Sequence, residues 1–302
     1  MAIKIVGVVG AGTIGRGVAQ ALAETGHRVL LVDVAQSQLQ GAVRSIARSV
    51  HVFHALRPRS GEPGGVAAAD IIDRIECSTD IALLGRADFV VENVTENRAV
   101  KQQLYRRLDE ICRPEVVFAV NTSAIPIAHN ASVTRRAERV VGMHFMNPVP
   151  LMPVVEVVRS AATAAETIAA ARTLVSQMGK DCVVVADSAG FVTNRVMMLT
   201  VNEAIELVQE GVASIEDVDR LFRTCFGHKM GPLETADLIG LDTVLFSLEV
   251  LRDELGNAKF EPCRLLRWMV DNGQLGRKTG SGFHHYQQAA RAQAGAASGR
   301  IE

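Results

Sequence analysis

The chain has 302 residues, of which 48% are hydrophobic and 22% charged, and its formal net charge at pH 7 is −1. This length suggests about two domains, with enough apolar residues for two cores. The near-neutral charge gives no electrostatic reason to expect a nucleic acid or an anionic membrane as a partner. No apolar run reaches the length of about 20 residues that a membrane-spanning helix needs. The first strand is expected to begin near Ile3, which argues against a signal peptide.

The cysteines argue for a reduced, cytoplasmic protein. There are five, an odd number, and none of them forms a C-x-x-C pair. A disulfide framework and a zinc ribbon are therefore not expected. His284 and His285 are adjacent but lack acidic or cysteine company in the sequence, so we predict no metal site.

The N-terminal segment predicts a dinucleotide site. Ile5–Val9 is wholly apolar, as a strand buried on both faces of a parallel sheet requires. Gly10, Gly12 and Gly15 follow at the spacing G-x-G-x-x-G, and residues 16–22 have helical periodicity. In this motif the first glycine allows a tight turn, the second lets a pyrophosphate approach, and the third lets the helix pack closely. The helix start offers free N–H groups to the phosphates.

Thr13 and Ile14, which lie between these glycines, are assigned to the same cofactor site. A second apolar strand, Arg28–Val32, ends at Asp33. An acidic residue about 20 positions after the glycines is expected to hydrogen-bond the adenosine ribose hydroxyls. Its charge would repel a 2′-phosphate, so we predict NAD rather than NADP as the cofactor.

Up to residue 187, apolar strands alternate with helical stretches. This alternation predicts an α/β fold with a Rossmann-type, doubly wound, mostly parallel sheet. A loop rich in glycine and proline interrupts it at residues 57–65. The expected helices cover about residues 36–55, 98–112 and 164–178, and the expected strands cover about residues 75–77, 87–94, 116–120, 139–145, 154–158 and 182–187.

Strand patterns vanish beyond Gly190. Residues 191–209 predict one long helix, Ser214 and Asp217 resemble a capping box, and further helices are expected to about residue 272. We therefore divide the chain into an NAD-binding domain (1–188), an all-helical domain (189–286) and a disordered tail (287–302), whose composition lacks a periodic apolar face.

Ligands of a doubly wound sheet bind at the carboxyl ends of its strands. The polar residues expected at these ends are Glu96, Asn121, Ser123, His144, Asn147 and Glu156. A carboxylate on one ring nitrogen of a histidine leaves the other nitrogen available as a base, which the oxidation of an alcohol by NAD requires. From spacing alone, His144 and Glu156 are equally compatible with a purely structural hydrogen bond.

Several longer motifs occur together along the chain. They are GAGTIGRGVAQ (10–20), VVENVTEN (90–97), NTSAI (121–125), HFMNPVPLMPVVEVV (144–158), GFVTNRV (190–196), MGPLETADLIGLDT (230–243) and GRKTGSGF (276–283). In these motifs and their order, the chain resembles the L-3-hydroxyacyl-CoA dehydrogenase family, which includes bacterial 3-hydroxybutyryl-CoA dehydrogenases. The likeness extends over nearly the whole chain up to Phe283.

The resemblance implies an NAD-dependent oxidation of a short-chain L-3-hydroxyacyl-CoA, such as 3-hydroxybutyryl-CoA, by a homodimer with its active site between two domains. It implies that the helical domain (189–286) serves substrate binding and dimerisation. It implies His144 as the general base and Glu156 as its orienting partner. Ser123, Asn147 and Asn194 would contact substrate or cofactor oxygens, Asn121, Glu96 and Lys101 would lie along the cofactor, and Lys278 would close over it. Alternatively, Ser123 only caps a helix, and Asn194, Lys101 and Lys278 only face water.

One region departs from the family pattern. The helix after Asp33 commonly carries a serine and lysines that meet the CoA phosphates. Ser49 matches the serine, but no lysine occurs between Lys4 and Lys101. Arg57 and Arg59, just beyond the helix, are candidate substitutes because a guanidinium suits phosphate.

Two alternatives to a CoA-dependent dehydrogenase stay open, and the first follows from this departure. In the first, the acyl group is tethered to an acyl carrier protein, as in polyketide pathways that make extender units. The phosphopantetheine arm of such a carrier lacks the adenosine 3′-phosphate and needs no basic clamp. In the second, the protein reuses the fold without catalysis, as lens crystallins do. The presence of both His144 and Glu156 speaks against the second.

Overall fold

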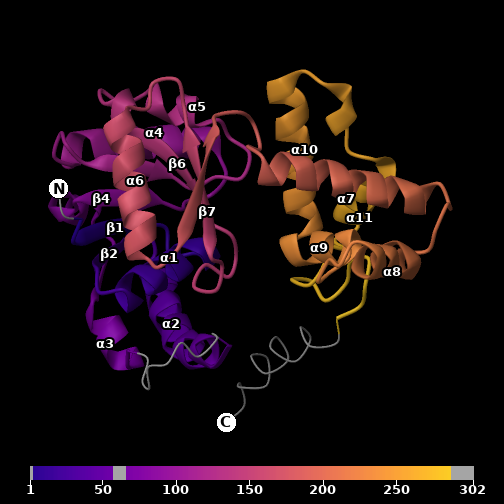
Figure 1. The fold of residues 1–302 in the computed structure, drawn as a ribbon, viewed down its shortest axis with the longest axis horizontal. Coiled ribbons are helices and arrows are strands. Elements are labelled where there is room, and N and C mark those ends of the chain that lie inside the picture. The colour runs from indigo at the N-terminus through magenta and orange to yellow at the C-terminus, as the bar shows by residue number, and fades with distance from the viewer. Residues whose placement is uncertain (1–2, 57–65, 287–302) are drawn as a thin grey trace, which may run out of the picture. The chain divides into compact units, whose positions relative to one another are not determined.

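The computed structural model describes residues 3–56 and 66–286, with the side chains of 54–56 left aside. Contacts divide the chain into two compact units, Met1–Ser188 and Ala189–Glu302 (Figure 1). We call the first the α/β unit and the second the helical unit. Arg57, Arg59 and the tail expected at residues 287–302 lie outside the described residues.

The α/β unit is built on one eight-stranded sheet with the order β3-β2-β1-β4-β5-β6-β7-β8. All neighbouring pairs are parallel except β6 and β7. This confirms the predicted mostly parallel, doubly wound sheet. The strands are β1 (Ile5–Val9), β2 (Arg28–Val32), β3 (Ile75–Ser78), β4 (Phe89–Glu92), β5 (Val117–Val120), β6 (Val140–His144), β7 (Val154–Arg159) and β8 (Asp181–Ala186).

Helices cover both faces of this sheet (Figure 1). The helices α1, α2 and α6 pack on one face, against side chains such as Val8 and Val91. On the other face, Tyr105 of α4 meets Phe118 of β5 edge-on, with 6.0 Å between the ring centroids. The helices are α1 (Thr13–Glu24), α2 (Gln36–Leu56), α3 (Ala68–Asp73), α4 (Arg98–Ile111), α5 (Ile127–Ala131) and α6 (Ala165–Gln177), with short 3₁₀ turns η1 (Ile81–Arg86) and η2 (Ala137–Arg139).

The reversal between β6 and β7 follows from a short connection. Parallel neighbours need a crossover of a dozen or more residues, usually a helix. Residues 145–153 join the two strands without a helix, so β7 can only return antiparallel. The register of this hairpin places His144 directly opposite Glu156.

The helical unit has its own apolar core, which includes Val201, Leu248 and Leu266. Ser214 begins α8 by accepting a hydrogen bond from the backbone N–H of Asp217 at 3.1 Å. No helix among the described residues combines the length and apolar character needed to cross a membrane. The helices are α7 (Thr193–Gln209), α8 (Ile215–Cys225), α9 (Pro232–Ile239), α10 (Leu241–Leu255) and α11 (Arg264–Asp271), with a 3₁₀ turn η3 (Ala258–Phe260).

Candidate functional site

The glycine turn between β1 and α1 has the geometry of a pyrophosphate site. Gly10 has φ +93°, a conformation that side chains rarely adopt. A Cβ on Gly15 would lie 1.8 Å from the carbonyl oxygen of Gly10, so only glycine lets α1 approach the turn. A Cβ on Gly12, in contrast, would meet nothing within 4 Å. No side chain caps α1 and no acidic residue occupies its first turn. Its N–H groups and positive dipole are available to an anion.

Thr13 and Ile14 open α1 just after Gly12. Thr13 is exposed, while Ile14 packs against the core on the α1 face of the sheet. Asp33 stands beside the turn at the end of β2. Its Oδ2 accepts the N–H of Ala11 at 2.8 Å, and its Oδ1 accepts that of Ala35 at 3.1 Å. Each carboxylate oxygen has a second lone pair, so both remain able to accept from ribose hydroxyls. The residues present therefore fit NAD.

His144 lies between a carboxylate and a hydroxyl. Its Nδ1 is 3.0 Å from Oε2 of Glu156, and its Nε2 is 3.0 Å from Oγ of Ser123. The exposed fractions of His144 and Glu156 are 6% and 5%. The carboxylate selects the tautomer with its proton on Nδ1, which leaves the Nε2 lone pair directed toward the serine hydroxyl. This arrangement leaves Nε2 able to accept a proton from a hydroxyl group.

Glu96 sets the position of Ser123. Its Oε1 accepts the backbone N–H groups of Ser123 at 2.8 Å and of Ala124 at 3.3 Å. The hydroxyl of Thr122 donates to the same oxygen. The loop after β5, which carries Ser123, is thus held by a carboxylate from the segment after β4.

A buried ion pair lies behind this loop, and sequence reasoning gave Glu92 no role. Nζ of Lys101 is 2.7 Å from Oε1 of Glu92, 3.0 Å from the carbonyl oxygen of Asn121 and 3.6 Å from Oε2 of Glu96. The side chains of Lys101 and Glu92 are 0% exposed. Burial raises the pKa of Glu92, and the neighbouring Lys101 ammonium opposes that rise. An acidic residue at the end of an otherwise apolar strand was the one available indication.

Asn121 links three strand ends. Its Nδ2 donates to Oδ1 of Asn93 at 2.9 Å, and its Oδ1 accepts the N–H of Phe145 at 3.1 Å. Asn147 is exposed on the segment that follows β6. On α2, Oγ of Ser49 lies 2.7 Å from Oε1 of Gln20 and so faces α1. Hydrogen bonds and ion pairs thus link Glu96, Lys101, Asn121, Ser123, His144 and Glu156, whereas the hydroxyl of Ser49 on α2 contacts Gln20.

Two predicted residues belong to the helical unit. Asn194 lies in the first turn of α7, and among the described residues its Nδ2 has no hydrogen-bond partner. A donor without a partner is costly unless a ligand satisfies it. Lys278 lies in the glycine-rich segment after α11, where its ammonium pairs with Asp242.

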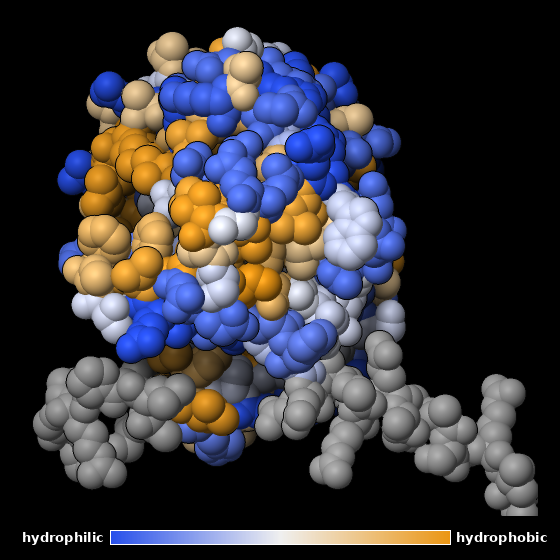
Figure 2. All heavy atoms as spheres, turned by 90° about the vertical axis from the view of Figure 1, so that its right-hand side faces the viewer, coloured by the Kyte–Doolittle hydropathy of each residue, from blue (hydrophilic) through white to orange (hydrophobic). Residues whose placement is uncertain are grey.

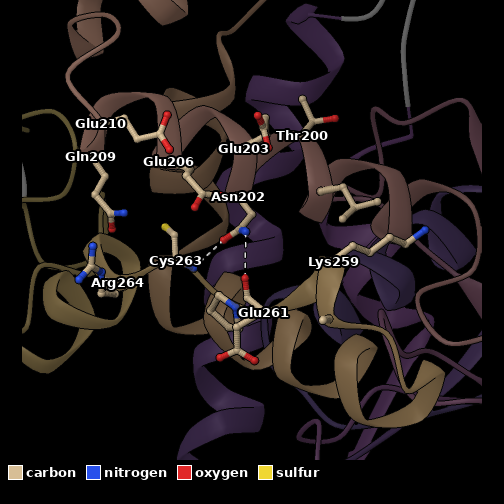
Figure 3. Close-up of a pocket in the computed structure, with 13 residues that line it drawn as sticks. Thr200, Asn202, Glu203, Glu206, Gln209, Glu210, Lys259, Glu261, Cys263 and Arg264 are labelled. Atoms are coloured by element: carbon tan, nitrogen blue, oxygen red, sulfur yellow. Dashed lines mark hydrogen bonds between the residues drawn. The ribbon is translucent and has the colours of Figure 1, made fainter.

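The helical unit also contains a cavity of about 1000 Å³ between α7 and the segment 258–264 (Figure 3). Within it, the Asn202 side chain binds the carbonyl oxygen of Glu261 at 3.1 Å and the N–H of Cys263 at 3.0 Å. Its lining holds more glutamates than cations, so it does not suit an anionic ligand. The charged residues are Glu203, Glu206, Glu210, Glu261, Lys259 and Arg264, none of them a predicted site residue.

Comparisons with known families identify both units. The pattern described as "3-hydroxyacyl-CoA dehydrogenase, NAD binding domain" matches residues 5–188. The pattern described as "3-hydroxyacyl-CoA dehydrogenase, C-terminal domain" matches residues 190–286.

Individual relatives are similar over almost their full length. A probable 3-hydroxybutyryl-CoA dehydrogenase of Bacillus subtilis (strain 168) is 42% identical, across 95% of this chain and 99% of the relative. The mitochondrial hydroxyacyl-coenzyme A dehydrogenase of Sus scrofa is 36% identical, across 94% and 92%. The crystal structure of (S)-3-hydroxybutyryl-CoA dehydrogenase from Ralstonia eutropha has a TM-score of 0.86 at 41% identity, covering 95% of this chain and all of that one.

Proposed function

The chain belongs to the 3-hydroxyacyl-CoA dehydrogenase family, a family of NAD-dependent oxidoreductases, and from that premise we propose that it interconverts short-chain L-3-hydroxyacyl-CoA and 3-ketoacyl-CoA with His144 as the general base. The single observation that carries the role of His144 is its position between Glu156 and Ser123, at 3.0 Å from each. The names of the relatives support a four-carbon acyl group, 3-hydroxybutyryl.

In the oxidising direction, the O–H and C3–H bonds of the substrate break together. NAD supplies the acceptor for the hydride. Nε2 of His144 takes the hydroxyl proton, and the C3–O bond becomes a carbonyl. The imidazolium formed is stabilised through Nδ1 by the Glu156 carboxylate. In reduction the same nitrogen returns the proton to the alkoxide oxygen.

Ser123 and Asn194 support this proposal as contacts to the substrate oxygens. Oγ of Ser123 points toward Nε2 of His144, where the reacting hydroxyl must also approach. A hydroxyl at that place accepts or donates one hydrogen bond and so orients the C3 oxygen. The unsatisfied Nδ2 of Asn194 is a donor suited to a carbonyl oxygen. Glu96, Lys101 and Asn121 act through the loop that carries Ser123, while Asn147 and Lys278 are proposed cofactor contacts.

The test is NADH consumption with acetoacetyl-CoA, together with NADH formation from the L and D forms of 3-hydroxybutyryl-CoA. We expect turnover with the ketoacyl and L-hydroxyacyl thioesters and none with the D form. Turnover of the D form alone, or of none of the three, would contradict the proposal.

One observation favours a second carrier. No lysine occurs between Lys4 and Lys101, so α2 lacks the lysines that the family resemblance leads us to expect at a CoA phosphate. The test compares kcat/KM for acetoacetyl-CoA with kcat/KM for the same acetoacetyl group on a holo acyl carrier protein, at equal concentration. A higher kcat/KM for the CoA thioester supports the first proposal, and a higher value for the carrier protein supports the second.

We also propose that the helical unit mediates a homodimer. On α7, Val196 is 60% exposed and Met197 36% exposed, whereas Met198 is buried in the unit's own core. Figure 2 shows apolar side chains gathered on a face of this unit. Light scattering at micromolar concentration is expected to give the dimer mass, with V196K shifting the protein toward the monomer. A monomeric wild type would refute this.

A further inference from the structure

A small cavity of about 90 Å³ lies in the α/β unit between α1, α2 and the segment 147–150. Close packing of α1 against that segment forms one wall, since a Cβ on Gly17 would lie only 3.1 Å from Cβ of Val149. The other lining residues share one face of each helix. They are Thr13, Arg16 and Gln20 on α1, Ser45, Ile46, Ser49 and Phe53 on α2, and Asn147, Pro148 and Pro150 on the segment between β6 and β7.

Among the described residues of this lining, Arg16 is the only charged one. It is half-buried, and in the described parts of the chain its guanidinium has no carboxylate partner. The hydroxyls of Ser45 and Ser49 line the same cavity from α2. A partly buried cation beside hydroxyls, with no acidic side chain in the lining, is a site for an anion.

We infer that Arg16 binds a phosphate group of the thioester substrate in this cavity, replacing the lysines that α2 lacks. The inference rests on the proposed function, because that function supplies a substrate whose carrier bears phosphates. The volume of about 90 Å³ suits one phosphate group and is too small for a whole nucleotide. The guanidinium forms paired hydrogen bonds with phosphate oxygens, and Asn147 in the cavity wall follows His144 by only three residues.

Phosphate could also come from the dinucleotide, since Arg16 lies on the helix whose start forms the pyrophosphate site. The lining favours the thioester. Of the proposed cofactor contacts, Thr13 and Asn147 line the cavity, whereas Gly10, Gly12 and Asp33 do not. The remaining walls come from α2 and from the segment after β6, the strand that ends in His144.

The experiment compares R16Q and R16K with the wild type on acetoacetyl thioesters of CoA, of 4′-phosphopantetheine and of pantetheine, which has no phosphate. We expect R16Q to raise KM for CoA by roughly 10–100-fold, the usual effect of losing hydrogen bonds to a charged group. In R16Q the KM for the pantetheine thioester, the KM for NADH and kcat should stay within about twofold of the wild-type values. R16K should recover part of the lost affinity for CoA. R48Q, an exposed arginine of α2 outside the cavity, is the matched control and leaves every constant unchanged.

The phosphopantetheine arm tells which phosphate is bound. If R16Q raises KM for the phosphopantetheine thioester, Arg16 binds the phosphate next to pantetheine. If it raises KM for the CoA thioester alone, Arg16 binds a phosphate at the nucleotide end of CoA. Both outcomes support the inference. Equal increases for all three thioesters, or a raised KM for NADH, would overturn it, the latter in favour of the dinucleotide. Calorimetry measures the affinity of the NAD-saturated protein for CoA without turnover. A lower CoA affinity in R16Q than in the wild type would therefore support the inference even if the wild type reduces no thioester.

Discussion

Lys101 donates from Nζ to Oε1 of Glu92 across 2.7 Å, where neither side chain is exposed. Through the same ammonium, the end of β4 is tied to the carbonyl oxygen of Asn121 at the end of β5. The loop that follows β5 carries Ser123, which contacts the proposed base. The ion pair therefore supports the site from within the sheet rather than from its surface.

Replacing only one partner of this pair is expected to be costly. K101M leaves the Glu92 carboxylate buried without a cation and should lower the free energy of unfolding by about 3–5 kcal/mol. The double variant E92L/K101M leaves no buried charge and should recover most of that loss. R107M on the exposed side of α4, where the pair with Glu110 is open to water, should cost at most about 0.5 kcal/mol. Urea unfolding measures all three.

This deficit depends on pH. Burial raises the pKa of Glu92, and removing the Lys101 ammonium raises it further. A raised carboxyl pKa adds stability at low pH, and that stability is lost as pH rises through the folded-state value. The K101M deficit should therefore shrink as pH falls from neutral toward the ordinary glutamate pKa of about 4.3 and be smallest below it. A deficit that is independent of pH, or a double variant no more stable than K101M, would contradict the assignment.

H144Q tests the general base. The glutamine keeps a polar side chain of similar size but cannot take the hydroxyl proton, so kcat should fall by about 10²–10⁴-fold. NADH binding, followed by fluorescence titration, should stay unchanged because the glycine turn is untouched. H228Q, an exposed histidine of the helical unit, should keep full activity. Retention of wild-type kcat in H144Q would remove His144 from the mechanism.

D33N tests the choice of cofactor. The amide oxygen still accepts the N–H of Ala11, which the Oδ2 of Asp33 holds at 2.8 Å, so the contact to the glycine turn is kept, while the N–H of Ala35 loses its acceptor. The charge that would repel a 2′-phosphate is lost, and the charged acceptor for the ribose becomes neutral. The ratio of kcat/KM for NADPH to that for NADH should rise at least roughly tenfold. D73N, an exposed position on α3, should leave the ratio unchanged, and an unchanged ratio in D33N would refute the role.

Asp109 should govern part of the acid stability. Burial acts to raise its pKa, but the hydrogen bonds from the Arg135 backbone and from the guanidinium groups of Arg135 and Arg136 outweigh it, so the pKa of Asp109 is lowered. A lowered carboxyl pKa adds stability above the unfolded value, about 3.9, that is lost as pH falls through the folded one.

D109N should accordingly be less stable than the wild type at neutral pH by about 3–5 kcal/mol, with Arg136 left buried. The two curves of stability against pH should converge in acid. E110Q, an exposed neighbour, provides the baseline. If the two curves stay parallel down to low pH, the carboxylate of Asp109 is not the source of the acid sensitivity.

The local patterns of the sequence predicted most of the elements. The strand Arg28–Val32 has its predicted bounds, and α4 differs by one residue at its end. Apolar residues recur about every two positions in a strand and every 3.6 positions in a helix when one face is buried. Both patterns continue along the whole of these segments. The helices α3 and α5, with six and five residues, were missed because so short a segment spans too few turns to show a period.

The pairing of His144 with Glu156 was foreseen as a possibility, but the tertiary structure alone decided it. Spacing along the chain does not show that β7 returns antiparallel beside β6, which sets the two residues face to face. The same holds for Lys101, which sequence reasoning left open as a surface charge and which the fold buries against Glu92. Periodicity records how each segment meets its own surroundings, whereas the partners of a buried polar group come from strands and helices far away in the chain. Only the packed sheet brings those partners together.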